Sequence, residues 1–582
     1  MACKTNSILK DIMPILPMEL HSWVRSSRIN GASTKTWLGG PKTTASRRRR
    51  LSSWFGAMLT LLAATAQADD HFIAINPSIL APPDPCAPTL LSLAPVESTN
   101  LDLPGPSTLI AYRRANAGSE SGFLSRRSPS PVVLFINGNG YGHPRYRAFA
   151  EFMARQGFIA AVLHRGTPTT AETVVQSLDA VFGAFDLASD TPVGLIGHSV
   201  GGGLAVDGAI FNASEANYDI RAIASLAPHI AGAGKLTGAH VEAYALVYGS
   251  QDEDVDGITG GIPNEAFAAY DRAGTEASTT CASPPCLSPP NGHLERFLAY
   301  IHGAGHPGLV NVPFCPGIQG QCLAQTAYLS TADQFCIAKG FSNALMQWKL
   351  RGNVQYRRVL TGQHLPASML AIKTNDQDFK DNPAGADLRM VIQYSPAARR
   401  RIQNFENWSN AQFFGNTTDV EAQVVQPGEL ATSGPMLRQD THLMLVTWPQ
   451  RAEMQWIGFN VPNDSMNISS YSHLALRIGH VRNSGGTEPP NASQDLMLCI
   501  RDNAHNLCRT IGNALPPVDL RPAQGDGDSL VGLPALRTIA VPFSSFIGFS
   551  DFNKQAAQTI FVVFPAGTQG TVAIDSIEWF RN

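Results

Sequence analysis

The stretch Val193-Gly-Leu-Ile-Gly-His-Ser-Val-Gly-Gly-Gly-Leu-Ala-Val206 decides the fold of the first half of the chain. Residues 193–196 read as a strand buried on both faces, and the Gly/Ala-rich residues after Ser199 begin a helix. Between them lies a Gly-x-Ser-x-Gly motif, whose small residues let the backbone turn sharply and lift the Ser199 hydroxyl above the sheet. The motif alone also fits a plain glycine turn, so a nucleophilic Ser199 requires further groups downstream.

A serine hydroxyl is a poor nucleophile at neutral pH, so it needs a base and a residue that orients this base. A carboxylate follows the apolar run 244–248, within Gly249-Ser-Gln-Asp-Glu-Asp254. We favour Asp252 as the orienting residue, and Asp254 is the alternative.

The expected base follows the next apolar run, 297–301, within His302-Gly-Ala-Gly-His-Pro307. His306 is preferred because a base needs a loop long enough to bend back over the serine. His302, which is still close to the strand, and His293, in a Pro-rich loop, are the alternatives.

Acyl-transfer chemistry also needs backbone N–H groups that face the developing negative oxygen. Val200, directly after the serine, supplies the first of these oxyanion-hole donors. The second is expected in the loop Asn137-Gly-Asn-Gly-Tyr-Gly-His143, where we favour Asn139, with Tyr141 as a neighbouring wall of the pocket. A flexible turn without a catalytic role is the alternative.

Apolar runs alternate with amphipathic stretches through residues 88–360, which predicts an α/β domain with a mostly parallel sheet covered by helices on both faces. The expected strands are 132–136, 158–163, 193–196, 220–226, 244–248 and 297–301. The expected helices are 145–156, 171–187, a segment that starts at 200, and 264–272.

The pattern of apolar and polar residues changes from about residue 361. Residues 361–402 are expected to be a linker, in which the run Arg399-Arg-Arg401 is a solvated surface. Residues 403–582 contain short runs of alternating polarity separated by Gly, Asn, Asp and Pro, which predicts a second, all-β sandwich domain.

Residues 1–68 have the features of a secretory signal. They carry ten basic and two acidic residues, and the apolar run that follows Arg47-Arg-Arg-Arg50 ends in Ala66-Gln-Ala68. This run is too short for a stable membrane span. The remaining 514 residues have 33 basic and 44 acidic side chains, so a nucleic-acid-binding body is not expected.

Cysteine usage agrees with export to a secreted or periplasmic location. Of the nine cysteines, Cys3 lies in the leader, and the remaining even number indicates disulfides in an oxidising compartment. The near pairs are Cys281/Cys286, Cys315/Cys322 and Cys499/Cys508, which leaves Cys86/Cys336 by elimination; other connectivities stay open. The spacing has no Cys-x-x-Cys cluster for zinc, so no metal is expected.

These motifs, in the chain order Ser199, Asp252, His306, resemble those of the α/β-hydrolase superfamily over residues 88–360. Within it the chain looks like secreted serine esterases of the dienelactone-hydrolase and polyesterase neighbourhood. The resemblance implies a two-step acyl-enzyme mechanism without a cofactor, acting on a small, lipid or polymeric ester. Two departures are Asn137-Gly138, where His-Gly is common, and Val200, where many relatives have Met or Trp.

The closing runs 559–564 and 570–579 look like the last strands of a galactose-binding-like jelly roll, the fold of many carbohydrate-binding modules. That resemblance implies an accessory domain that binds a glycan or a polymer surface. Some such modules hold a structural calcium ion, and here Asp575 is the candidate ligand of such an ion. Tryptophans in this half form either a stacking platform or the sandwich core: Trp408, Trp448, Trp456 and Trp579. An inactive hydrolase-fold protein that binds glycans or surfaces is the alternative function.

Overall fold

The computed structural model describes residues 95–581 with internal gaps. Outside the description lie 1–94, 105, 116–129, 141, 165–169, 216–217, 230–233, 235, 250–251, 253–268, 271–272, 274–293, 302, 312–328, 363–364, 373–387, 394–398, 404, 406–412, 416–419, 426–442, 482–495, 512–536 and 582. The expected leader, 1–68, is therefore outside the described residues. None of the described helices is both long and apolar enough to cross a membrane.

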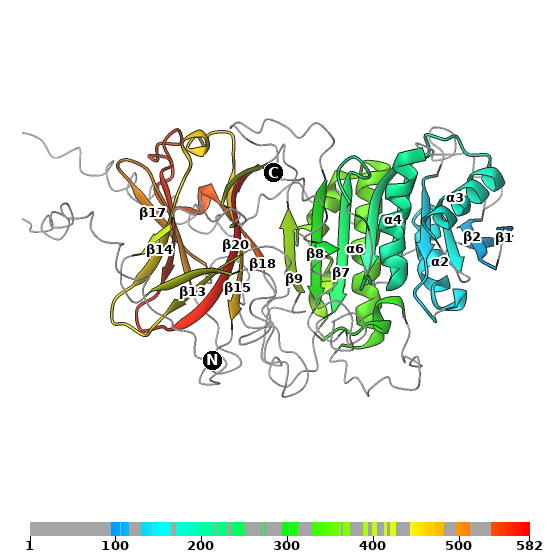
Figure 1. Cartoon of the computed structure of the whole chain (residues 1–582), viewed down its shortest axis with the longest axis horizontal. Helices are drawn as coiled ribbons and strands as arrows, with labels where there is room; N and C mark the ends of the chain where they lie inside the picture. The colour runs from blue at the N-terminus through cyan, green and yellow to red at the C-terminus, as the bar shows by residue number, and fades with distance from the viewer. Residues whose placement is uncertain are drawn as a thin grey trace, which may run out of the picture. The chain divides into compact units, whose positions relative to one another are not determined.

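The first half is built on one mixed sheet with the strand order β1-β2-β4-β3-β5-β6-β7-β8-β9 (Figure 1). The strands are β1 (Val96–Leu101), β2 (Thr108–Arg114), β3 (Val132–Ile136), β4 (Ile159–His164), β5 (Val193–His198), β6 (Ile220–Leu226), β7 (Ala243–Gly249), β8 (Glu295–Ile301) and β9 (Leu388–Gln393). From β4 to β8 neighbouring strands run parallel, whereas β1, β2 and β9 are antiparallel to their neighbours. Every residue of β3, β5, β7 and β8 is buried, as a sheet covered on both faces requires.

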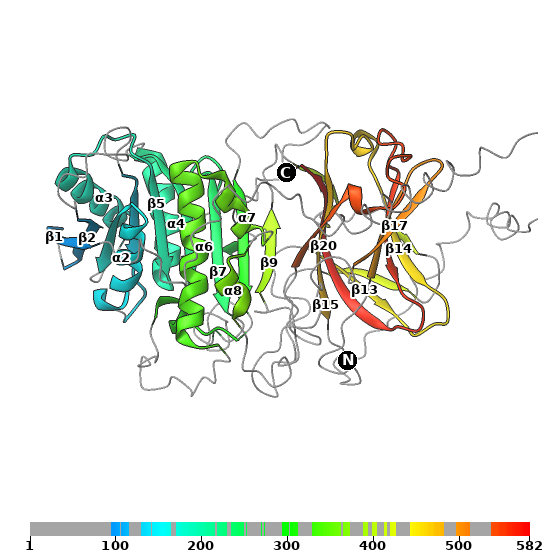
Figure 2. The same cartoon turned by 180° about the vertical axis from the view of Figure 1, so that it is seen from behind.

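Helices cover this sheet. They are α2 (Arg147–Arg155), α3 (Ala171–Phe185), α4 (Val200–Glu215), α6 (Thr331–Arg351), α7 (Arg357–Leu360) and α8 (Ala367–Ala371). α3 packs against α4, and α2 contacts α6 through the edge-to-face rings of Phe149 and Phe335, whose centroids are 5.5 Å apart. Figure 2 shows the long helix α6 running alongside the strands of the sheet. From β3 the chain crosses to β4 on one side, and from β5 it crosses to β6 on the other, so right-handed crossovers put α2 and α4 on opposite faces. The order reverses between β3 and β5, and the carboxyl ends of strands at such a point are where α/β sheets bind ligands.

Strands lie at all six positions expected from the apolar runs, and three of the expected helices are α2, α3 and α4. The fourth, 264–272, falls mostly outside the described residues. The helix α6 was not expected, because its polar side chains Ser342, Asn343 and Gln347 are as buried as its apolar ones. A helix enclosed on nearly every side shows no amphipathic period in its sequence.

The segment 361–402, expected to be a linker, contributes a strand to each half of the chain. It contains β9, which pairs with β8, and β10 (Arg399–Gln403), which pairs with β20 of the second half. Arg399 donates to Glu578 at 3.0 Å and Arg400 pairs with Asp464. The expected solvated surface is wrong for Arg399, because its side chain is only 9% exposed and faces a carboxylate distant in the sequence.

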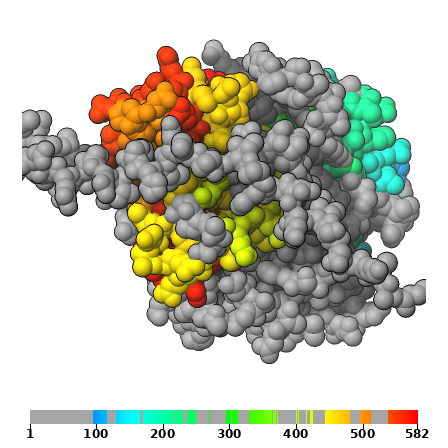
Figure 3. All heavy atoms as spheres, turned by 60° about the vertical axis from the view of Figure 1, so that its left-hand side comes forward, coloured from blue at the N-terminus to red at the C-terminus, as the bar shows by residue number. Residues whose placement is uncertain are grey.

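The second half consists of two antiparallel sheets, which confirms the predicted all-β character. One sheet has the order β12-β13-β20-β15-β18, with β10 also on β20, and the other has the order β11-β14-β19-β16-β17. The strands are β11 (Phe413–Gly415), β12 (Glu421–Val425), β13 (Leu443–Trp448), β14 (Gln455–Asn460), β15 (His473–Val481), β16 (Leu496–Arg501), β17 (Asn506–Ile511), β18 (Arg537–Pro542), β19 (Thr559–Phe564) and β20 (Gly570–Phe580). Figure 3 shows segments of this half, yellow to red in chain order, side by side on one surface. Side chains from both sheets share one core, including Val446 and Leu476 of the first sheet and Ile457 and Val562 of the second.

The tryptophans divide between two environments. Trp448 and Trp579 are buried in the core between the sheets, so these two do not form a stacking platform. Trp456 belongs to a separate cluster and packs edge-to-face on Phe414, with ring centroids 5.5 Å apart. Trp408 lies outside the described residues.

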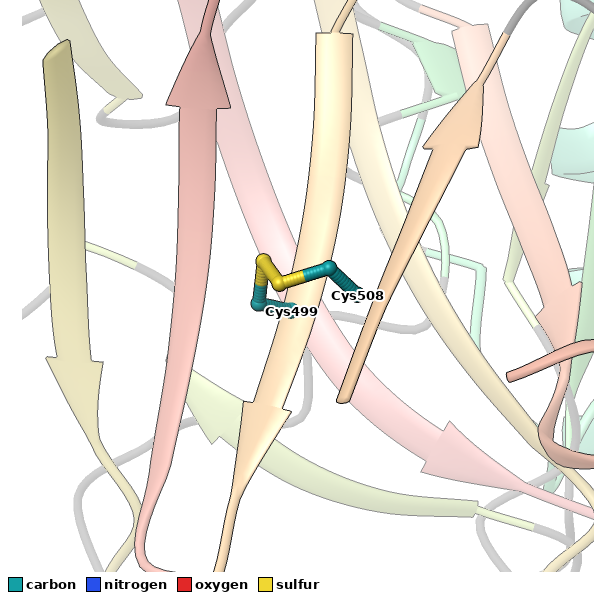
Figure 4. Close-up of a disulfide and its surroundings, with 2 residues drawn as sticks. All are labelled: Cys499 and Cys508. Carbon is teal, nitrogen blue, oxygen red and sulfur yellow. A yellow bond between two sulfur atoms is a disulfide. The ribbon is translucent and has the colours of Figure 1, made fainter. Parts of the chain in front are cut away.

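One of the expected disulfides joins Cys499 and Cys508, which face each other across β16 and β17 (Figure 4). Cys336, in α6, is also disulfide-bonded. The cysteines Cys86, Cys281, Cys286, Cys315 and Cys322 lie outside the described residues. The three other pairings therefore remain predictions.

Candidate active site

Ser199 occupies the sharp turn between β5 and α4. Its φ is 56°, a left-handed conformation that is uncommon and strained for a residue with a side chain. The turn is tight because Gly197 packs directly on the next turn of chain: a Cβ there would lie 2.1 Å from the carbonyl oxygen of Gly201. The Ser199 backbone is bonded to the neighbouring strand end, since its N–H donates to Leu226 O at 3.0 Å and its carbonyl accepts from the His229 N–H at 2.9 Å. The sequence motif thus forms the strained strand-to-helix turn that it predicts.

Asp252 and His306 come together from the loops after β7 and β8. Nδ1 of His306 lies 3.1 Å from Oδ1 and 3.0 Å from Oδ2 of Asp252, and both side chains are almost fully buried. A carboxylate only accepts hydrogen bonds, so Nδ1 carries the proton and Nε2 is the basic nitrogen of the neutral ring. The alternatives Asp254, His302 and His293 lie outside the described residues.

The His306 loop is fastened to α6 through Gln334. Oε1 of this buried side chain accepts from the Gly305 N–H at 3.1 Å, and Nε2 donates to Leu329 O at 2.8 Å. Gln334 therefore bonds to the residue directly before His306 and to the chain that leads into α6. Nothing in the local sequence marks it, because its partners are backbone groups of other loops.

His198, the residue before Ser199, links the serine turn to His306. Its Nε2 lies 3.2 Å from the carbonyl oxygen of His306, and the two imidazole rings are 4.7 Å apart between centroids. Burial, and then the nearby His306, hold the pKa of His198 well below its usual range, so the ring is neutral near pH 7. In the Gly-x-Ser-x-Gly motif, His198 occupies the first variable position, so the motif assigns it no role.

The loop after β3 lies against the serine turn. A Cβ on Gly138 would come within 2.9 Å of both the Ser199 Cβ and the His198 Nδ1, so its backbone approaches the turn as closely as a glycine allows. The buried Asn137 holds this loop, because its Nδ2 bonds to Gly138 O at 3.1 Å and to His164 Nδ1 at 3.2 Å. Asn139, the expected oxyanion donor, follows directly and is exposed.

Of the other two residues expected around the oxyanion hole, the structure describes Val200 but not Tyr141. Val200 is the first residue of α4, and the first N–H groups of a helix have no partner within that helix. Its amide thus lies directly after the nucleophile, at the positive end of the helix dipole. Tyr141 lies outside the described residues.

The described residues contain no group of three or more His, Cys, Asp or Glu side chains arranged to hold a metal ion. Asp575, a candidate calcium ligand, is buried and accepts from Arg477 Nη1 at 2.5 Å. An arginine thus neutralises the carboxylate for which the resemblance implied a calcium ion.

No protein-family model matches the sequence, and none of the curated proteins matches it. Among solved structures, the chain is similar to a family 11 carbohydrate-binding module from Clostridium thermocellum in complex with a beta-1,3-1,4-mixed-linked tetrasaccharide, at 13% identity and a TM-score of 0.22 over 32% of this chain and 96% of the module. It is also similar to a Pyrobaculum calidifontis esterase, at 18% identity and a TM-score of 0.20 over 25% of this chain and 49% of the esterase. The chain therefore spans about half the length of that esterase. Likenesses at this level assign neither fold nor function, so the description of the site depends only on the distances and contacts given above.

Proposed function

We propose that the chain is an exported serine hydrolase of the α/β-hydrolase type that cleaves carboxylic esters through an acyl-enzyme. The observation that carries the proposal is the buried hydrogen bond between His306 Nδ1 and Asp252, in a chain whose Ser199 is held in a strained strand-to-helix turn. A base oriented by a carboxylate and a serine in such a turn are two parts of one catalytic arrangement.

In this mechanism Ser199 Oγ attacks the ester carbonyl carbon and its proton passes to Nε2 of His306. Asp252 holds the ring in the tautomer whose Nε2 accepts this proton, and it stabilises the imidazolium that forms. The N–H groups of Val200 and Asn139 stabilise the negative oxygen of the tetrahedral intermediate. His306 then gives its proton to the leaving alcohol as the ester C–O bond breaks. A water molecule, deprotonated by the same nitrogen, next attacks the acyl carbon. The bond between this carbon and Ser199 Oγ breaks, Oγ takes the proton back from His306, and the acid leaves.

The second half is proposed to be an accessory jelly-roll domain that holds a glycan or polymer surface near the ester. Support for export comes from the signal-like leader, and from the Cys499–Cys508 disulfide, because disulfides persist in oxidising compartments. The ester itself is small, lipid or polymeric.

The test uses the whole chain with short-chain, long-chain and polymeric esters and with a fluorophosphonate probe. The wild-type chain is expected to turn over at least one ester class, and the probe to label Ser199. Ser199→Ala is expected to lose both activities. Ser214→Ala is the matched control, since Ser214 is an exposed serine near the other end of α4.

Two results would contradict the proposal. One is labelling of the intact chain at another residue, with turnover that survives Ser199→Ala. The other is no turnover of any ester together with saturable binding of a glycan or polymer, which would favour the inactive surface-binding protein instead.

A further inference from the structure

A line of hydrogen bonds crosses the interior from the loop after β3 to the loop that carries His306. The N–H of Gly138 donates to the hydroxyl of Tyr146 at 2.8 Å, and this hydroxyl lies 2.9 Å from Nδ1 of His198. Nε2 of His198 lies 3.2 Å from the carbonyl oxygen of His306. The line thus joins the residue before Asn139, the residue before Ser199 and the backbone of His306.

The chemistry of the groups fixes the direction of each bond. A carbonyl oxygen only accepts, so Nε2 of His198 carries a proton and donates to His306. The buried ring is neutral, so Nδ1 has a lone pair and accepts the hydroxyl hydrogen of Tyr146. The hydroxyl in turn accepts from Gly138. Every donor in the line therefore faces an acceptor.

The line lies in the interior and connects elements distant in the sequence. Tyr146 and His198 are each 1% exposed, so water does not replace a bond that is lost. Tyr146 directly precedes α2, whose Phe149 packs on α6, and His198 ends β5. A shift at either side chain would therefore move the oxyanion loop or the His306 loop against Ser199.

We propose that Tyr146 and His198 are positioning residues. They fix the loop after β3, which carries Asn139, and the loop that carries His306 in place relative to Ser199. This inference rests on the proposed function, because it assigns these side chains a role in the same reaction. Neither side chain takes part in bond making. Each acts through its neighbour, Tyr146 through Gly138 and His198 through the backbone of His306.

The test compares the whole chain with Tyr146→Phe, which removes only the hydroxyl, and with two replacements of His198. His198→Gln places an amide N–H near the position of Nε2 and keeps a donor for His306. His198→Asn places its amide near Nδ1 and loses that donor. Tyr218→Phe is the matched control, because it removes a tyrosine hydroxyl bonded to Asp179 just before β6, at the opposite end of the sheet strands.

Tyr146→Phe is expected to lower kcat between about 10- and 100-fold with KM nearly unchanged, as for a misplaced transition-state donor. Its affinity for a trifluoromethyl ketone inhibitor, which presents an oxyanion after Ser199 adds to it, is expected to fall by a similar factor. His198→Asn is expected to slow fluorophosphonate labelling of Ser199 more than His198→Gln does. Tyr218→Phe is expected to keep the wild-type constants.

A folded Tyr146→Phe with wild-type kcat and ketone affinity would overturn the inference, and so would a loss confined to melting temperature or to KM. Equal labelling rates for His198→Asn and His198→Gln would overturn the part assigned to His198. A wild-type chain that neither hydrolyses esters nor labels at Ser199 would overturn the proposed function and this inference with it. An active wild type with unaffected variants would overturn the inference alone.

Discussion

Replacement of Gln334 by methionine tests how the His306 loop is held. Methionine has similar length but removes the acceptor for Gly305 N–H and the donor for Leu329 O. A buried polar group left without a partner costs about 1–3 kcal/mol, so two such groups cost about 2–6 kcal/mol. Even the lower value corresponds to about 30-fold in the local opening equilibrium, at about 1.4 kcal/mol per factor of ten.

Hydrogen exchange of the peptide that contains Gly305, read with ester turnover, is the assay. In Gln334→Met the Gly305 amide is expected to exchange about 30-fold faster or more, and kcat is expected to fall because His306 shifts against Ser199. Gln176→Met is the control, because Gln176 bonds only a neighbouring side chain, Glu172, on the surface of α3. Unchanged exchange and kcat in Gln334→Met would refute the role of Gln334.

Three further changes test other parts of the molecule. Asp252→Asn is expected to lower kcat by about 10⁴-fold while fluorescence and melting temperature report an intact fold; a loss under tenfold would contradict its orienting role. Gly197→Ala places a methyl group 2.1 Å from the Gly201 carbonyl oxygen, so thermal unfolding is expected to show about 1–3 kcal/mol of destabilisation, and wild-type stability would disprove the close approach. Burial raises the pKa of Asp502, but backbone N–H groups from Asn553 and from its own turn lower it to about 2. Asp502 is therefore expected to stabilise the fold above about pH 4 and to lose this effect as pH falls through about 2, so the melting-temperature gap to Asp502→Asn should close on acidification.

The parallel sheet and the meeting of Asp252 with His306 were predictable because both depend on local patterns. A strand buried on both faces is a continuous apolar run, and Asp252 and His306 each follow the end of such a run within a few positions. The carboxyl ends of parallel strands meet at one edge of the sheet. Two residues that each follow such a strand are therefore expected to lie close together, and β7 and β8 are parallel neighbours. Asp252 and His306 do lie together, because their side chains are hydrogen-bonded.

The supports of the site were not predictable, because each depends on groups that meet only in the folded chain. Gln334 reads as one polar residue in a helix, and its side chain bonds to backbone groups outside that helix, Gly305 N–H and Leu329 O. Tyr146 reads as an apolar side chain before α2, yet its hydroxyl bonds to Gly138 and His198. Arg399 and Arg400 read as solvated because their carboxylate partners, Glu578 and Asp464, are far away in the sequence.

The adjacency of β9 and β10 determines where the chain tolerates a cut. Only residues 394–398 separate the strand that ends one sheet from a strand of the other. A fragment that stops before β9 would leave the backbone of β8 unpaired along one edge, and an unpaired edge promotes aggregation. A fragment that begins at 403 would remove most of β10 from its partner β20. A protease site or an expression boundary placed within 394–398 keeps both strands, whereas a cut a few residues away on either side truncates one of the sheets.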